Sequence, residues 1–347
     1  MGFASRIFKL LAAAVVLLFP CMSSAQELTV GVIGTSSDAP FYIADKRGYF
    51  RDAGLSVKFV RFDSAAKAMA PLGTGQLEVA SGATSAGLYN AVTRGIGIKI
   101  VADKARNAKG YGFTAFMVRK DLIDSGRVKS FKDFKGLKVA VSALGSSESF
   151  LLAEALRQNG LALDDVERVN IGFSQHVVAF ENRAIDASIS VEPAITAIVN
   201  AGKAVRFVGV DEIYPDYQTA VTFYGDKFVA EKPKAARGFM TALVHGMRDY
   251  ADALQNGRLA GPGADAIIAI MAEYSPLRDP ALYRAMTSHY CDPDGQVNIE
   301  ALRRTWAFFK DNKQIDGTVT VDQIIDTSFA KAAVVALGPY VRKNAAR

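Results

Sequence analysis

The sequence is poor in the residues that build disulfides and metal centres. Its 347 residues include two cysteines, Cys21 and Cys291, and three widely separated histidines. Neither cysteine has a CxxC partner, no histidine pair has metal-ligand spacing, and a single cysteine remains if the N-terminal segment is removed. The chain also lacks a GxSxG nucleophile elbow and a GxxxxGK[ST] phosphate loop. We therefore expect no disulfide, no metal site and no cofactor.

Long runs of one charge are missing too. The formal net charge is +6, and no cluster of lysine and arginine resembles the basic patch of a nucleic-acid-binding protein. We expect no nucleic-acid partner. The small positive surplus either favours an anionic ligand or serves solubility alone.

The first 25 residues have the three parts of a secretory signal. Arg6 and Lys9 supply positive charge, residues 10–19 are all apolar, and small residues precede a cut after Ala25. The apolar run is shorter than the roughly 20 residues that span a bilayer. We predict a signal peptide at 1–25 and a periplasmic protein. A lipid anchor on Cys21 is the alternative, but Pro20 stands where a lipobox has a small residue.

A pattern of strand, polar loop, helix and strand occurs twice. The pattern near residues 28–103 returns near 137–212, at an offset of about 109 residues. This order is typical of a parallel sheet, so we predict two related α/β lobes. Two more candidate strands, 113–118 and 219–224, are expected to cross between the lobes as a hinge. Lobe one would comprise residues 27–116 plus 222–347, and lobe two residues 117–221.

Four loops follow the predicted strands, at residues 34–40, 81–85, 142–147 and 189–193, and most of them are rich in serine and threonine. Ligands of open α/β sheets bind beyond the carboxyl ends of the strands. Hydroxyl groups and free amides at helix starts either cap the helix or hold an anion. Phe41 is the aromatic residue best placed to wall such a cleft, and Glu192 either accepts a ligand hydrogen bond or serves the helix dipole. Arg106 and Lys109 are read as solvated surface charges.

Several of these segments resemble a known family. The run Ala39-Pro40-Phe41-Tyr42-Ile43-Ala44, together with 46–50, 53–55, 62–65, 75–79, 131–136 and Val191-Glu192-Pro193-Ala194, is similar to the periplasmic nitrate/sulfonate/taurine-binding proteins, which include pyrimidine-precursor binders. The resemblance covers roughly residues 28–230. It implies a type II periplasmic binding protein fold and delivery of a small solute to an inner-membrane ABC permease with its ATPase, by a protein expected to act as a monomer.

The same resemblance implies which residues line the ligand. Carried onto this sequence, they are Ser37, Phe41, Thr84, Ser85, Ser146, Ser147 and Glu192. One departure is that Val191 stands where many relatives have tryptophan, so the ligand cannot be copied from a relative. The expected solute is a sulfonate or a carboxylate.

Other functions remain open at this stage. A pyrimidine or another flat heterocycle is the alternative solute. An enzyme on the same lobes would need a histidine or lysine in the cleft, and His176 is the candidate nearest a predicted loop. A sensor subunit of a signalling system is a further alternative.

Overall fold

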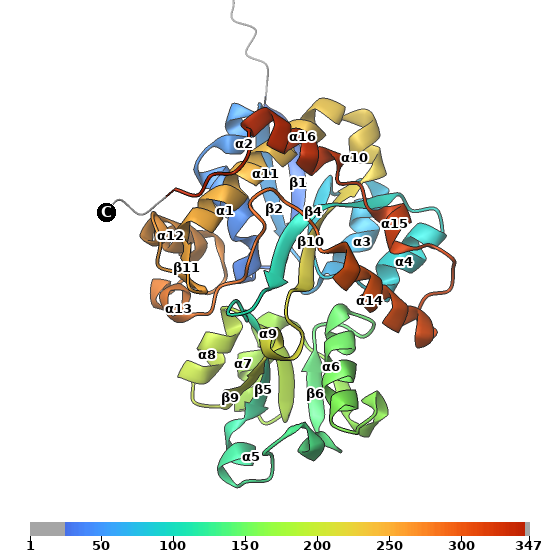
Figure 1. Ribbon diagram of the computed structural model, residues 1–347, viewed down its shortest axis with the longest axis vertical. Helices are drawn as coiled ribbons and strands as arrows, with labels where there is room; N and C mark the ends of the chain where they lie inside the picture. The colour runs from blue at the N-terminus through green and yellow to red at the C-terminus, as the bar shows by residue number, and fades with distance from the viewer. Residues whose placement is uncertain (1–24, 344–347) are drawn as a thin grey trace, which may run out of the picture.

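The computed structural model describes residues 25–343 and contains two five-stranded sheets (Figure 1). The predicted signal peptide and Cys21 lie outside the described residues, apart from Ala25. In the part of the chain that is described, no helix has both the length and the apolar character needed to cross a bilayer.

The first sheet has the strand order β2-β1-β3-β10-β4. Its strands are β1 (Gln26–Val32), β2 (Leu55–Arg61), β3 (Val79–Gly82), β4 (Ile98–Asn107) and β10 (Tyr217–Gly225). Strand β10 is antiparallel to both of its neighbours, whereas β1 runs parallel to β2 and β3. The helices of this half are α1 (Ala39–Lys46), α2 (Tyr49–Asp52), α3 (Ala65–Thr74), α4 (Ala86–Thr93), α10 (Asp226–Glu231), α11 (Pro233–Ala253), α12 (Ala264–Tyr274), α13 (Pro280–Ala285), α14 (Ile299–Asp311), α15 (Val321–Ile324) and α16 (Ser328–Leu337). A short hairpin pairs β11 (Leu254–Gln255) with β12 (Arg258–Leu259).

The second sheet has the order β7-β6-β8-β5-β9. Its strands are β5 (Thr114–Arg119), β6 (Lys138–Val141), β7 (Glu167–Asn170), β8 (Ala187–Val191) and β9 (Ala204–Gly209). Its helices are α5 (Lys120–Asp124), α6 (Ser147–Gln158), α7 (His176–Glu181), α8 (Ala194–Asn200) and α9 (Val210–Ile213). In both sheets the fourth strand is antiparallel to its neighbours, so the orders correspond position by position. The internal repeat predicted from the sequence is confirmed in this topology.

The chain passes between the sheets twice. It leaves the first sheet after β4 and enters the second at β5, and it returns through α9 into β10. The sheets therefore change within residues 108–113 and 210–216, slightly before the predicted lobe limits at 116/117 and 221/222. The predicted crossing strands each belong to one sheet, and the crossings themselves are the segments beside them.

Helix α11 shows why the C-terminal part is helical and where it packs. Its apolar residues recur at helical spacing, and the predicted stripe Ala235, Phe239, Leu243, Met247 and Tyr250 is buried in the core of the first half. Helix α14 joins both halves, because Phe308 contacts the cores on either side. Thr305 of the same helix lies 3.2 Å from the Tyr217 hydroxyl.

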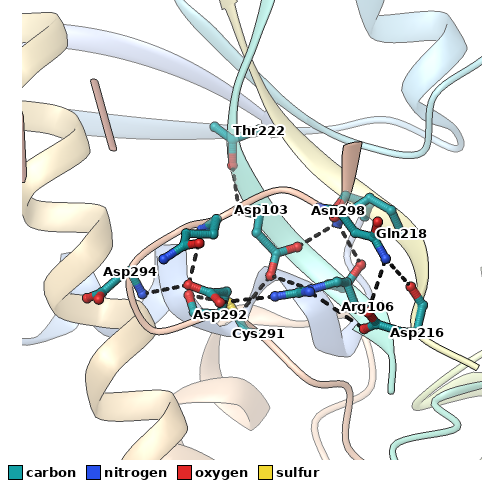
Figure 2. Close-up of polar contacts among 12 residues, drawn as sticks. Asp103, Arg106, Asp216, Gln218, Thr222, Cys291, Asp292, Asp294 and Asn298 are labelled. Carbon is teal, nitrogen blue, oxygen red and sulfur yellow. Dashed lines mark hydrogen bonds and ion pairs between the residues drawn. The ribbon is translucent and has the colours of Figure 1, made fainter. Parts of the chain in front are cut away.

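A group of charged side chains joins the end of β4 and the residue before β10 to the C-terminal segment (Figure 2). We call it the hinge cluster; its members are Asp103, Arg106, Asp216 and Asp292. The Arg106 guanidinium lies 3.0 Å from Asp292 and 3.6 Å from both Asp103 and Asp216. Gln218 donates to Asp103 at 2.6 Å, and the Asp292 amide donates to Asp103 at 2.7 Å. The reading of Arg106 as a solvated surface charge is wrong, because its side chain is only 13% exposed and lies against Tyr290 and Asp292.

Candidate ligand-binding site between the two sheets

The turns that follow the strands of both sheets meet each other. The Ser36 amide donates to the Glu192 carbonyl at 2.9 Å, which joins the turn after β1 to the turn after β8. A second meeting point pairs Ser85 with Ser146 as an isolated β-bridge, with hydrogen bonds from the Ala86 amide to Gly145 and from the Ser147 amide to Thr84. The two halves therefore contact each other on both sides of the space between them, so the structure corresponds to a closed form.

An ion pair lies buried at the bottom of this space. Lys104 of β4 places Nζ 2.6 Å from Asp38 Oδ1, and neither side chain is exposed. The other Asp38 oxygen accepts from the amides of Ile33, Gly34 and Thr35 at 2.7–3.2 Å. No described residue offers Lys104 Nζ a hydrogen bond of good geometry beyond this ion-pair contact. The ammonium group therefore keeps donors that a guest can use.

Glu148 approaches the same space from the second half. It lies in the first turn of α6, and its Oε2 accepts from the hydroxyls of Ser142 and Ser146 at 2.6 and 2.5 Å. Burial raises the pKa of Glu148, while the two serine hydroxyls oppose that rise. Both hydroxyls bind the same oxygen, so neither occupies Oε1.

Glu192 is more fully used by the protein itself. Its Oε2 accepts from the amide and the hydroxyl of Thr196 at 3.0 and 2.9 Å, and its Oε1 lies 3.4 Å from the Thr287 amide. Burial raises the pKa of Glu192. The side chain thus holds the start of α8, which is the capping role that the sequence left open beside ligand binding.

The space between the halves has two neighbouring chambers, which we call the inner and outer chambers. The inner chamber has a volume of about 30 Å³ and is lined by Lys104, Glu148, Ser37 and Thr219 among others. The outer chamber has a volume of about 280 Å³, mostly apolar walls, and Arg61 at its edge. The two chambers share the lining residues Ile33, Thr35, Phe173 and Val191.

Six of the seven predicted site residues are brought together here. Ser37 lines the inner chamber, Glu192 lines the outer one, and Thr84, Ser85, Ser146 and Ser147 form the second meeting point. Phe41 is the exception. Its ring packs 6.3 Å from the ring of Phe239 in the core behind the cleft, with no exposed surface. The turn before Phe41 reaches the cleft, but helix α1 directs this side chain toward α11.

The sequence analysis missed three buried charged residues at the site, Asp38, Lys104 and Glu148. Lys104 and Asp103 directly follow the apolar run Ile100-Val101-Ala102 in β4, and this was the available signal, because charged residues inside a buried strand are rare unless paired. His176 is also not free for chemistry. Its ring nitrogens lie 2.7 Å from the Ser190 hydroxyl and 2.9 Å from the Ile171 carbonyl, and burial lowers its pKa to about 4.

Comparison with known proteins identifies a family that matches most of the chain. Residues 35–255 match the family described as NMT1/THI5 like. A protein of Brucella abortus, provisionally named as a binding protein, is 32% identical over 35% of this chain, and the match spans only 38% of that protein's length. The taurine-binding periplasmic protein of Escherichia coli is 26% identical over 52% of this chain and 53% of its own length.

Solved structures extend the similarity to almost the whole chain. The periplasmic nitrate-binding protein of Synechocystis PCC 6803 has a TM-score of 0.73 at 15% identity and covers 90% of this chain and 89% of its own. A desulfurization enzyme shares the fold, with a TM-score of 0.63 and 17% identity over 90% of this chain and 99% of its own. The predicted periplasmic binding protein fold is confirmed.

Proposed function

Because the chain belongs to the NMT1/THI5-like family, we propose that it is the periplasmic solute-binding component of an ABC importer. In this role it captures a small organic molecule with a sulfonate or carboxylate group between its two lobes. It then delivers the molecule to the inner-membrane permease and its ATPase. We propose that it acts as a monomer whose two lobes divide within residues 108–113 and 210–216, close to the limits predicted from the sequence, and that export removes residues 1–25.

One observation carries this proposal: the turns of both sheets meet around a buried lysine whose ammonium still has donors to offer. Backbone amides and hydroxyls at helix starts, together with a cation, are the groups that replace the hydration of an acidic solute. A solute that touches both lobes at once is bound fully only in the closed form, so binding shifts the population toward closure.

Thermal unfolding with a panel of solutes tests the proposal. A solute present at 100 times its dissociation constant stabilises the protein by about 2.7 kcal/mol through linkage. We expect at least one sulfonate or carboxylate to raise the midpoint, and mass spectrometry of the freshly purified protein to detect a bound small molecule. If sulfonates, carboxylates, nitrate and pyrimidines all leave the midpoint unchanged, the proposal is wrong.

Catalysis is the competing function, because a desulfurization enzyme has this fold and Lys104 lies in the cleft. A binding protein returns its solute unchanged. We therefore expect solutes that stabilise the protein to be recovered intact after prolonged incubation, as measured by mass spectrometry. Conversion that disappears in Lys104→Met would establish an enzyme instead.

A further inference from the structure

The buried charges around the two chambers do not favour a plain anion. Asp38, Glu148 and Glu192 are carboxyl groups with at most 4% of their surface exposed, and Lys104 is the buried cation among them. Arg61 lies only at the exposed edge of the outer chamber. A solute with an acidic group alone can accept from Lys104, but it offers no donor to the Glu148 oxygen that Ser142 and Ser146 leave unused.

The two polar groups that face the inner chamber from opposite lobes have complementary needs. Lys104 Nζ is buried, unpartnered apart from its contact with Asp38, and can donate to an acidic group. Glu148 approaches from the start of α6 and can accept from an amino group through the oxygen that its serine partners do not use. A donor and an acceptor on either side of one small chamber fit a molecule that carries both charges.

We propose that the solute is a zwitterion, whose acidic group binds Lys104 and whose amino group binds Glu148. Its remaining, apolar part occupies the outer chamber. This inference rests on the proposed function and narrows the class of solute from organic acids to amino acids and aminosulfonates.

The outer chamber supports the apolar part of the inference. Its walls include Ile33, Phe173, Val177, Val191 and Leu277, which are hydrocarbon surfaces, and it is about nine times as large as the inner chamber. A chamber of about 30 Å³ holds only a head group, since one water needs roughly 10–15 Å³ on the same measure. The charged groups therefore enter first, and the body of the solute follows into the outer chamber.

Matched pairs of solutes that differ only by an amino group test the inference. The pairs are norleucine with hexanoate and taurine with ethanesulfonate, measured by isothermal titration calorimetry on the wild-type protein. We expect the amino member of each pair to bind at least about tenfold more tightly, which corresponds to one charge-assisted hydrogen bond. Because the outer chamber is apolar, norleucine should also bind more tightly than alanine.

The variant Glu148→Gln tests whether Glu148 causes the preference for the amino-bearing solute. Glu148→Gln keeps the size of the side chain and removes its charge, so the preference within each pair should fall below about threefold. The control is Glu154→Gln on the same helix, whose side chain pairs with Arg157 outside the chambers and which should keep the full preference. A melting curve establishes that each variant is folded, and the wild-type pairs decide the matter alone if Glu148→Gln does not fold.

The outcomes separate the two proposals. Equal binding of the members in both pairs would overturn the zwitterion and leave the solute-binding function intact. No binding of any tested acid, with or without an amino group, would argue against the proposed function itself. A preference that persists in Glu148→Gln would move the amino group to another carboxylate and overturn the role given to Glu148.

Discussion

Two neighbouring residues of one strand enter two different groups of buried charge. Asp103 and Lys104 are adjacent on β4, and adjacent residues of a strand point to opposite faces. Asp103 joins the hinge cluster, where residues of the C-terminal segment and β10 surround it. Lys104 joins Asp38 and Glu148 beside the inner chamber, and we call these three residues the cleft cluster.

The clusters differ in how many carboxylates surround the cation and in whether the cation lines a chamber. In the hinge cluster one guanidinium contacts three carboxylates, and hydrogen bonds from Gln218 and a backbone amide add to them. In the cleft cluster the ammonium has one ion pair and an adjoining cavity. Each cation keeps one nitrogen without a hydrogen bond, Arg106 Nε and Lys104 Nζ, and of the two it is Lys104 that lines the inner chamber and is placed to bind a ligand.

Removing the centre of the hinge cluster should have the largest effect. Arg106→Met leaves three carboxylates without their cation, and breaking a buried ion pair from one side costs about 3–5 kcal/mol. Urea unfolding measures the loss. The matched control is Arg303→Met, an exposed arginine that also contacts two carboxylates, which should cost less than about 1 kcal/mol. Similar losses in both variants would show that the hinge cluster is not a special source of stability.

The pH dependence of stability should sharpen the comparison. Burial raises the pKa of Asp103 from 3.8 to about 6, so the folded state holds this proton more tightly than the unfolded state. Its stabilising contribution is complete below pH 3.8 and is lost as the pH rises through about 6. Two pKa units correspond to about 3 kcal/mol. The unfolding free energy of the wild type minus that of Asp103→Asn should therefore rise by about that amount from pH 7 to pH 4.

The titration of buried His176 changes stability with pH in the opposite direction, so its effect has to be separated from that of Asp103. Burial lowers the pKa of His176 to about 4, so its contribution is present above pH 6.5 and is lost as the pH falls toward 4. The wild-type curve is the sum of both effects and can look flat. The difference between wild type and Asp103→Asn cancels the histidine term, and a gap that stays constant with pH would contradict the pKa shift of Asp103.

The repeated architecture could be predicted because its signals are local. Strand, loop and helix follow from alternation, capping residues and glycines within about 30 residues, and the second copy confirms the first. The position of the turns at the carboxyl ends of the strands then follows from the parallel order. This reasoning brought the turns at Ser37, Ser85, Ser146 and Glu192 to one cleft without any knowledge of side-chain direction.

Side-chain direction and long-range burial could not be predicted in the same way. Phe41 follows a cleft turn, but the rotation of α1 against α11, which lies about 200 residues later, decides where its ring points. Arg106 is charged and precedes a loop, which is typical of a surface residue. Its burial depends on Tyr290 and Asp292, whose segment folds back over β4. Contacts between residues that are about 200 positions apart leave no pattern in the local sequence.

The smallest expected effect on stability comes from replacing Ser85 or Ser146, the two serines that pair across the cleft. Ser85 Oγ accepts from the Leu88 amide at 3.2 Å and caps α4, whereas Ser146 Oγ donates to Glu148 and makes no cap bond to α6. Ser85→Ala should therefore cost about 1 kcal/mol of unfolding free energy. Ser146→Ala should cost less in stability, but it should weaken binding of amino-bearing solutes, because Glu148 loses a partner that orients it.

Unfolding in urea and calorimetric titration with norleucine measure the two effects on the same preparations. The bridge between Ser85 and Ser146 is built from backbone atoms, so both alanine variants keep the contact that closes the cleft. Any difference between them therefore reports on the hydroxyl groups. If Ser146→Ala lowers stability as much as Ser85→Ala and leaves binding unchanged, Ser146 belongs with the groups that hold the fold, and Glu148 does not depend on it.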